Sequence, residues 1–394
     1  MKRIIRVAAL ALGLVLLGPV TAAVPFEEIA PPAGPPTEGK TLTSNNDEIS
    51  VLSRDQGVRI DAVPLPDVHP TYLRFDDGSI RFWIQGGGGT SIFTTTDFKS
   101  FTPSPISSHV THVLAPSKPL SDLFDADYAG GSSIFPSANR RDLLMIYHAE
   151  NHYGHAYGTA GVTAFYASIG IARSADGGKT WSRQGPVITG REAQTGYPPP
   201  NIGLGAGNPS AIVTGGYIYV FYIDNVSRTG QFRGINSLCL ARAPIATDGR
   251  PGSWTKYYQK SFSQPGIGGL CQAPVPPPSA KSGVTFQSNP DISFNSALNA
   301  FLLVFQSDDG FFYATSSDMA SWSPPRLFMS TPPNLQGLRT PGAEYYYYPL
   351  LVTPSAASDQ LTGADGFIFY AKGKQDARLT QSNHSWYRRS WSIR

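Results

Sequence analysis

A corner motif recurs along the chain at nearly equal steps, and it restricts the folds that the sequence can adopt. In each copy an apolar stretch leads to an Asp and then to an aromatic residue, as in "SIFTTTDFKSF", "GIARSADGGKTW", "CLARAPIATDGRPGSW" and "FYATSSDMASW". The aspartates are Asp97, Asp176, Asp248 and Asp318, and successive ones lie 79, 72 and 70 residues apart. One further step ends near "SWYRRSWSI" at the end of the chain. Similarity at a fixed period indicates a repeat architecture, here of five units.

Each unit also contains two apolar segments before its corner. The middle segments are "IRFWIQG", "LLMIYHAEN", "YIYVFYIDN", "FLLVFQSDD" and "GFIFYAKG", and a shorter strand with turn residues precedes each of them. A weak fourth strand such as "GPVI" or "KYYQKSF" follows the corner. Strands that are apolar on both faces are typical of sheets packed between neighbouring sheets. The pattern predicts an all-β fold, a five-bladed β-propeller. The alternative is a β-sandwich whose corners resemble one another by coincidence.

The N-terminal part of the chain differs in composition from the repeats. Residues 1–23 combine cations, an apolar core and small residues, which predicts a cleaved signal peptide and a secreted or periplasmic protein. Residues 24–48 are rich in Pro, Gly, Thr and acids and are expected to form a disordered linker. The propeller domain is then expected over 49–394, with no membrane span.

Charge and cysteine content limit the partners. The net charge is only +3 and no Lys/Arg block occurs, so nucleic acid is not expected as a partner. Cys239 and Cys271 are the only cysteines. In an exported chain they are expected to form one disulfide, the alternative being two isolated buried thiols. We expect a monomer without cofactor.

The segment "SADGGKTW" matches Ser-x-Asp-x-Gly-x-Thr-Trp at every fixed position and resembles the Asp-box of sialidase-like (BNR-repeat) propellers. In those families the corner lies on the outer rim and is not catalytic. The shorter "SSDMASW" and "TTDFKSF" are similar to corners of five-bladed glycosidases such as glycoside hydrolase family 43. That resemblance implies an inward Asp on the first blade, a second Asp that modulates a pKa and a Glu acid. The first blade here offers Asp67 and His69 instead of one clear Asp, and the third blade offers Asn208.

A propeller binds its ligand at one end of its axis, so the candidate residues come from the first and second strands of each unit. Glycoside hydrolysis needs two carboxyl groups. The candidate catalytic residues are Glu150, Glu344, Asp127 and Asp291. The candidate substrate-binding residues are Asp67, His69, Trp83, His148, Asn208, Asp224, Gln306 and Tyr345. Loop acids often only cap turns, which is the structural alternative for Asp127, Asp291 and Glu344.

The sequence therefore predicts a carbohydrate-active protein, with a glycoside hydrolase as the first choice. A polysaccharide lyase using His148, Tyr166 and Arg173 is one alternative, because lyases abstract a proton next to a uronate. A propeller that only binds carbohydrate is the other. Sialidase activity is not expected, since Arg74 is the nearest match to the first-blade arginine. The "HAENH" spacing differs from that of HExxH metalloproteases, so no metal site is expected.

Overall fold

The computed structural model describes ten parts of the 394-residue chain: residues 29–52, 66–106, 112–155, 164–194, 203–225, 236–279, 281, 286–333, 340–375 and 384–394. The predicted signal peptide, 1–23, lies outside the described residues, as does the start of the predicted linker. The described parts consist of β-strands, turns and one short 3-10 helix, η3 (Ile245–Thr247). None of the described residues belongs to a helix that is long and apolar enough to cross a membrane.

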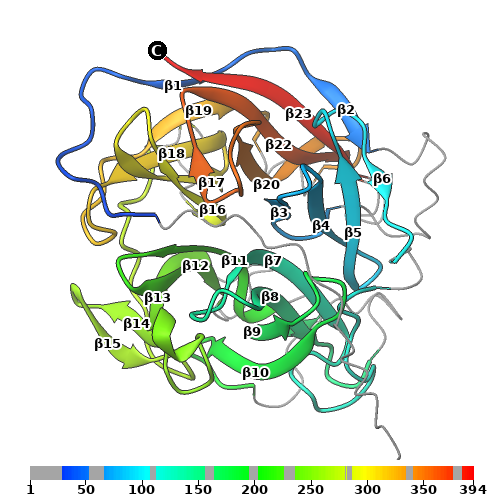
Figure 1. The fold of residues 1–394 in the computed structure, drawn as a ribbon. Helices are drawn as coiled ribbons and strands as arrows, with labels where there is room; N and C mark the ends of the chain where they lie inside the picture. Colours follow the sequence, from blue (N-terminus) through cyan, green and yellow to red (C-terminus); the bar gives the residue numbers. More distant parts are fainter. Residues whose placement is uncertain are drawn as a thin grey trace, which may run out of the picture.

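The strands form five blades arranged around one axis (Figure 1), and two of the blades are hydrogen-bonded into one nine-stranded sheet. Blade 1 contains β3 (Thr71–Arg74), β4 (Ile80–Gly86), β5 (Gly89–Thr95) and β6 (Thr102–Pro103). Blade 2 contains β7 (Tyr128–Pro136), β8 (Leu143–Asn151), β9 (Phe165–Ser174) and β10 (Ser182–Thr189). Blade 3 contains β11 (Gly203–Thr214), β12 (Tyr217–Asn225), β13 (Asn236–Pro244), β14 (Thr255–Tyr258) and β15 (Ser261–Pro265). Blade 4 contains β16 (Ser288–Asn295), β17 (Ala300–Ser307), β18 (Gly310–Ser316) and β19 (Arg326–Ser330). Blade 5 contains β20 (Glu344–Val352), β22 (Asp365–Lys374), β23 (His384–Ile393), β1 (Leu42–Ser44) and β2 (Ile49–Leu52).

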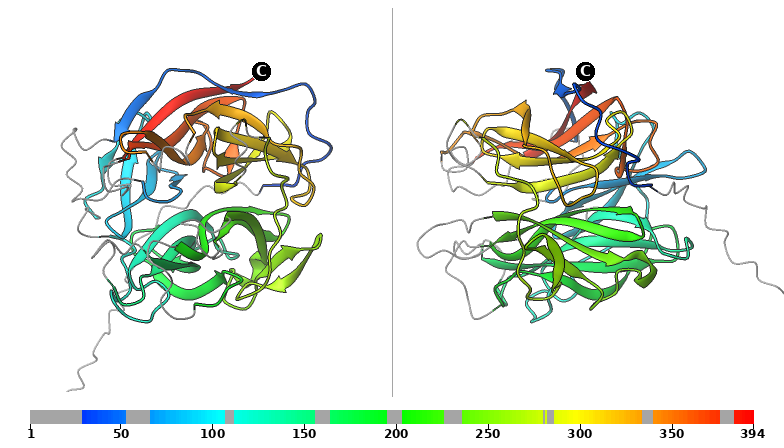
Figure 2. Two further views of the ribbon diagram at one scale, coloured as in Figure 1. Left: turned by 180° about the vertical axis from the view of Figure 1, so that it is seen from behind. Right: turned by 90° about the vertical axis from the view of Figure 1, so that its left-hand side faces the viewer.

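Five apolar clusters fill the interfaces between successive blades, and they explain why the middle strands are apolar on both faces. The cluster between blades 2 and 3 includes Ile169 and Tyr222, and the next clusters join blades 3 to 4 and 4 to 5. Phe82 and Trp386 pack together between blades 1 and 5, with ring centroids 5.7 Å apart. A fifth cluster joins blades 1 and 2. The ring is therefore closed, and the predicted five-bladed all-β propeller is confirmed; Figure 2 gives two further views of it.

The N-terminal segment closes the ring by completing blade 5. Strand β1 pairs with the end of β23, with Leu42 opposite Ile393, and β2 pairs with an earlier part of β23. Both lie along β23 in Figure 1. Strand β1 falls within the predicted linker, so ordered structure begins before residue 49. The sequence did not predict β1 because its surroundings are rich in turn-forming residues and the strand has only three residues. Its pairing partner, β23, lies at the far end of the sequence.

The corner of blade 2 is a rigid structural element. Asp176 Oδ1 accepts hydrogen bonds from the backbone N–H groups of Lys179 and Thr180, both at 3.0 Å. The indole N–H of Trp181 donates to the carbonyl oxygen of Gly178 at 3.0 Å. The same carbonyl lies 3.3 Å from Trp83 Nε1 of blade 1. The corner thus fastens its own hairpin and docks on the neighbouring blade.

The other corners follow or modify this pattern. Asp97 and Asp318 accept backbone hydrogen bonds in the same way. Asp248 differs, because it accepts from the backbone N–H of Ala138 at 2.7 Å and from Arg173 at 2.9 Å. It therefore links blade 3 to blade 2.

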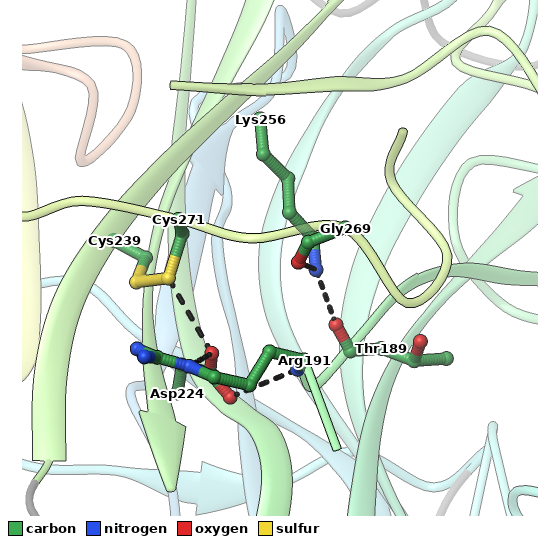
Figure 3. The surroundings of a disulfide bond; sticks show 7 residues. All are labelled: Thr189, Arg191, Asp224, Cys239, Lys256, Gly269 and Cys271. Carbon is green, nitrogen blue, oxygen red and sulfur yellow. Dashed lines mark hydrogen bonds and ion pairs between the residues drawn. A yellow bond between two sulfur atoms is a disulfide. The ribbon is translucent and has the colours of Figure 1, made fainter. Parts of the chain in front are cut away.

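A disulfide fastens the outer part of blade 3, as expected for the cysteine pair. Cys239 of β13 is bonded to Cys271, which follows β15 (Figure 3). The buried Lys256 ammonium donates to the carbonyl oxygens of Thr189 and Gly269 at 2.6 and 2.7 Å. Burial lowers the pKa of Lys256 to about 8.

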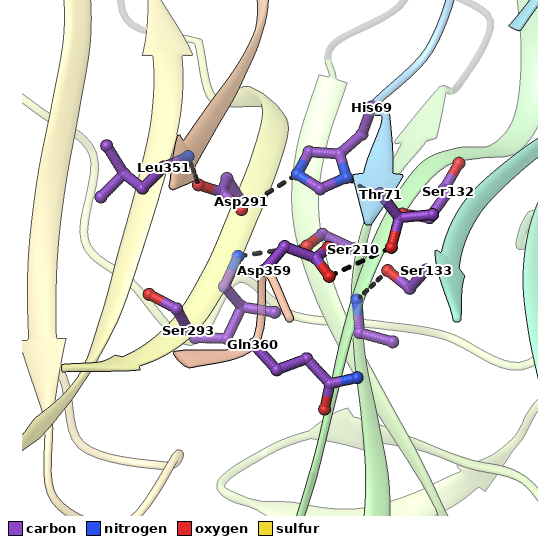
Figure 4. A network of polar contacts seen from close by, with 12 residues as sticks. His69, Thr71, Ser132, Ser133, Ser210, Asp291, Ser293, Leu351, Asp359 and Gln360 are labelled. Atoms are coloured by element: carbon purple, nitrogen blue, oxygen red, sulfur yellow. Dashed lines mark hydrogen bonds and ion pairs between the residues drawn. The ribbon is translucent and has the colours of Figure 1, made fainter. Parts of the chain in front are cut away.

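A segment between β20 and β22 makes polar contacts with several blades, and Figure 4 shows its Asp359 and Gln360. Gln360 accepts a hydrogen bond from the N–H of Val213 through its side chain and from the N–H of Phe294 through its carbonyl oxygen. Asp359 accepts from the hydroxyl of Thr71 at 3.1 Å. Strand β21 (Leu361–Thr362) pairs with β16 in parallel. This segment joins the first strands of blades 1, 3 and 4 to blade 5 at the axis.

We predict that Gly178→Ala destabilises the protein more than Gly177→Ala. Both residues have positive φ, +83° and +74°, so both variants pay the left-handed strain of about 1 kcal/mol. A Cβ on Gly178 would lie 2.5 Å from the ring of Trp83, whereas a Cβ on Gly177 has nothing closer than 3.8 Å. The clash should add roughly 1–3 kcal/mol. Urea unfolding midpoints measure the difference, and equal midpoints would contradict the docking of the corner on blade 1.

Candidate active site

The candidate site lies where the first strands of the blades begin. Strand β7 contacts β3 and β11, and β16 contacts β11 and β20, so these strands surround the axis. Because β8 runs antiparallel to β7, its last residues return to the end where β7 starts, with Glu150 opposite Tyr128. Side chains from several blades therefore meet at this end.

Glu150 is held between two histidines. Its Oε1 lies 2.9 Å from His148 Nε2, and its Oε2 lies 2.7 Å from His152 Nε2. The backbone N–H of Asn208 on β11 donates to His148 Nδ1 at 3.1 Å. Since Nδ1 accepts, the ring proton of neutral His148 is on Nε2, where it donates to Glu150. Blade 3 thus orients a histidine that orients the Glu150 carboxylate.

These contacts keep Glu150 ionised. Burial alone would raise its pKa, but the hydrogen bonds that His148 and His152 donate outweigh burial and lower the pKa to about 2. Burial also opposes the protonation of His152. The hydrogen bond and charge of Glu150, with the charge of Asp127, outweigh it and raise the pKa of His152.

Asp67 has the opposite environment. Burial, and next the negative charge of Glu150, raise its pKa to about 8, and the nearby Tyr128 hydroxyl offsets this only in part. The Tyr128 hydroxyl is buried and has no hydrogen-bond partner of normal geometry in the described part of the chain. Its ring centroid lies 5.6 Å from that of His148. At neutral pH the site therefore holds a protonated carboxyl, a carboxylate and a buried tyrosine hydroxyl that interacts with Asp67.

A chain of amide side chains leads away from this group. Asn208 Nδ2 donates to Asn289 Oδ1 at 2.7 Å, and Asn289 Nδ2 donates to Gln306 Oε1. The chain joins blade 3 to the neighbouring blade 4. The structure thus brings together the predicted residues Asp67, His148, Glu150, Asn208 and Gln306.

Backbone strain marks the same end of the axis. Asn208, Asn289 and Tyr348 have left-handed φ values of 48°, 49° and 54°. Each precedes a proline in a strand whose register shifts at that point. Such conformations cost energy and cluster at functional sites. The recurring "NP" and "YP" pairs of the sequence are the signal of this ring of positions.

Two predicted residues lie deeper along the axis. His69 Nε2 and Asp291 Oδ1 form a buried ion pair at 2.9 Å, and Asp291 Oδ2 accepts from the N–H of Leu351 at 2.7 Å (Figure 4). His69 Nδ1 donates to the carbonyl oxygen of Ser132 at 3.0 Å. Although burial opposes it, the hydrogen bond to Asp291 raises the pKa of His69. The pair joins blades 1, 2, 4 and 5, and Asp291 uses both of its oxygens there.

Three further predictions disagree with the packing. Trp83 and Asp224 were expected to bind substrate, but both are completely buried. Trp83 belongs to the core between blades 1 and 2, and Asp224 forms an ion pair with Arg191 at 3.0 Å beside the disulfide (Figure 3). Tyr345 is also completely buried, with its hydroxyl 3.3 Å from His384 Nδ1. Strands with two buried faces do not reveal which face is turned to a neighbouring blade.

The remaining predicted acids have other contacts. Asp127 accepts hydrogen bonds from the backbone N–H groups of Leu120 and His152 at 2.9 and 2.8 Å. It therefore caps a turn, as in the structural alternative to a catalytic role. Glu344 is partly exposed at the start of β20, where it accepts from the Tyr346 hydroxyl at 3.0 Å and lies 3.6 Å from Lys372.

The structure does not bring all three residues of the alternative lyase mechanism together. His148 is in the site, but Arg173 lies at the opposite end of blade 2, where it binds Asp142 and Asp248. Tyr166 donates its hydroxyl to the carbonyl oxygen of Glu192 at 2.5 Å.

Sequence reasoning missed Tyr128, His384 and the axial Asp359. Tyr128 follows "FDAD" at the start of a strand, a position that could have pointed to it. The roles of His384 and Asp359 depend on contacts between distant parts of the chain.

One group of described residues has the spacing of metal ligands: Asp224, Cys239 and Cys271. Its two sulfur atoms are bonded to each other, and Asp224 is paired with Arg191. This group lies apart from Glu150 and does not fit a metal ion in its oxidised form.

Comparison with solved structures supports the fold. One similar structure is Zg3597, a family 117 glycoside hydrolase from the marine bacterium Zobellia galactanivorans. It is 11% identical, with 89% of this chain and 90% of that chain covered and a TM-score of 0.51. The β-xylosidase RS223 is 10% identical over 88% of this chain and 95% of its own, with a TM-score of 0.48. No protein-family model and no curated protein matches the sequence. At 11% identity, the similarity to Zg3597 shows the propeller fold alone.

Proposed function

We propose that the protein is an exported glycoside hydrolase that cleaves a poly- or oligosaccharide at the end of the propeller axis where Asp67 and Glu150 meet. The observation that carries the proposal is the pair itself: two neighbouring carboxyl groups whose environments hold one protonated and the other ionised. Glycoside hydrolysis requires this division between an acid and a base or nucleophile. The activity named for the family 117 structure is of the same reaction class.

In the proposed reaction Asp67 donates its proton to the glycosidic oxygen as the bond to the anomeric carbon breaks. The Glu150 carboxylate, oriented by His148 and His152, removes a proton from the attacking water or adds to the anomeric carbon directly. In both cases one water is consumed and two hydroxyl ends are released. Asn208, whose side chain is partly exposed, is the residue that we propose to bond sugar hydroxyls.

A screen of the purified mature protein on plant, algal and bacterial polysaccharides tests the reaction class. Release of reducing ends without ultraviolet absorbance supports hydrolysis, whereas absorbance from unsaturated products indicates a lyase. Binding without release of either product favours a carbohydrate-binding propeller. N-terminal sequencing of the exported protein tests cleavage after residue 23.

We expect Asp67→Asn and Glu150→Gln each to lower kcat by about 10²- to 10⁴-fold, because each removes one proton-transfer or nucleophilic group. Asp77→Asn is the matched control: Asp77 is an exposed acid in the turn after β3 and should leave kcat unchanged. Steady-state kinetics on the substrate found in the screen measures the effect. Full activity in either site variant would remove that carboxyl from the mechanism.

The pH dependence of kcat/KM should follow the two pKa values. Asp67 must carry a proton, so the rate should fall as the pH rises through about 8. Glu150 must be ionised, and its pKa of about 2 predicts no loss of rate on acidification to about pH 4 from this group. A basic limb well below pH 7 would assign the proton to another residue.

Asp67→Asn should also stabilise the protein, increasingly with pH. The native protein holds the Asp67 proton up to about pH 8, while an unfolded chain releases it near pH 4. The wild type therefore loses stability between pH 4 and pH 8, and the amide variant avoids that loss. The difference should reach roughly 1–3 kcal/mol at pH 9 and vanish near pH 4. Urea unfolding at both values checks it, and a difference that is independent of pH would contradict the raised pKa.

A further inference from the structure

We infer that His384 and Tyr345 of blade 5 are positioning residues that hold the Asp67 carboxyl in the site by binding the carbonyl oxygen of Pro66. The inference rests on the proposed function for its meaning, because it concerns the proton donor of that reaction. Both residues act through the Pro66 carbonyl oxygen and not through a bond to the Asp67 carboxyl group.

The contacts form a directed chain. His384 Nε2 lies 2.8 Å from the carbonyl oxygen of Pro66, which can only accept, so Nε2 carries the proton. In the neutral ring Nδ1 is then an acceptor, and the Tyr345 hydroxyl lies 3.3 Å from it. His384 is 3% exposed and Tyr345 is completely buried, so water does not replace these bonds. The Tyr345 and His384 rings also meet edge to face, with centroids 6.0 Å apart.

The backbone around Asp67 needs such support. Residues 66–70 precede β3 and belong to no strand. On the other side of Asp67, the His69 side chain is fixed to blades 2 and 4 by Ser132 and Asp291. Pro66 is fixed to blade 5 by His384. Asp67 thus lies between two histidine anchors in an otherwise irregular segment, and loss of either anchor would free the carboxyl to move toward water.

Displacement of an acid from its site has a specific consequence. Burial and the Glu150 carboxylate raise the pKa of Asp67, and the Tyr128 hydroxyl lowers it in part. Movement toward solvent would reduce the effect of burial and of the Glu150 charge. The Asp67 pKa should then fall toward its ordinary value, and the misplaced acid should lower kcat more than it raises KM.

The test compares His384→Leu, His384→Gln and Tyr345→Phe with the wild type. The Asp67 pKa is measured by carbon NMR of Asp-labelled protein, with Asp67→Asn assigning the signal. We expect His384→Leu to lower this pKa by at least one unit and kcat by about 10- to 100-fold. His384→Gln should recover part of both, because its amide can donate to the Pro66 carbonyl. Tyr345→Phe should produce a smaller shift in the same direction and tests the chain even if His384→Leu does not fold.

Tyr313→Phe is the matched control. It also removes a buried hydroxyl, one that accepts from the N–H of Leu42 in another part of the ring, and should leave the Asp67 pKa unchanged. Folded His384→Leu or Tyr345→Phe with an unchanged Asp67 pKa overturns the inference. Wild-type protein that hydrolyses no carbohydrate overturns the proposed function instead, because the NMR comparison needs no turnover.

Discussion

The pairing of the N-terminal segment with the last strand is the constraint on which the rest of the molecule depends. Strands β1 and β2 cover β23, and the Glu48 carboxylate between them binds Tyr370, Lys372 and Arg389 of blade 5. This closure brings the lead-in to blade 1 beside the start of β23. The hydrogen bond between His384 and Pro66 therefore spans 318 residues of sequence. The proton donor of the proposed reaction lies one residue further along, so its position depends on the closed ring.

Two groups of charged residues at the axis have different roles: one stabilises the ring, and the other serves the proposed reaction. Deep in the ring, His69 and Asp291 neutralise each other and join four blades. At the end of the axis, Asp67 has no cationic partner in the contacts that set its pKa, and a carboxylate is its strongest charged neighbour. Like charges that are held together lower the stability of the folded state but keep a proton on an acid at neutral pH. The buried pair of His69 and Asp291 thus stabilises the ring in which the less favourable pair of Asp67 and Glu150 is held.

Periodic features of the sequence predicted the architecture, because each blade depends on local patterning. Apolar strands, corner aspartates and the cysteine pair all occupy the expected structural positions. The direction of individual side chains was harder to predict, since both faces of a middle strand are buried. Trp83 packs against blade 2, and Asp224 forms an ion pair with Arg191. "YHAENH" did identify a true cluster, because its acid and histidines are local neighbours at a strand end. Tyr345, His384 and Asp359 derive their roles from chain closure and from the axial segment, which no local pattern encodes.

The corner "SADGGKTW" and the site illustrate two different uses of aspartate in one blade architecture. Asp176 accepts hydrogen bonds from the Thr180 hydroxyl and from the backbone N–H groups of its corner. These bonds outweigh its burial and lower its pKa, so it is a fixed anion with no proton to exchange. Asp67 lies in an irregular segment with no comparable set of donors among the causes of its pKa, and its protonation responds to burial and to Glu150. Because Glu150 contributes to the raised pKa of Asp67 and is itself fixed by His148 and His152, the acid and the base form one electrostatic unit. A change at either histidine acts on both carboxyl groups, so the site includes the imidazoles as much as the carboxyls they orient.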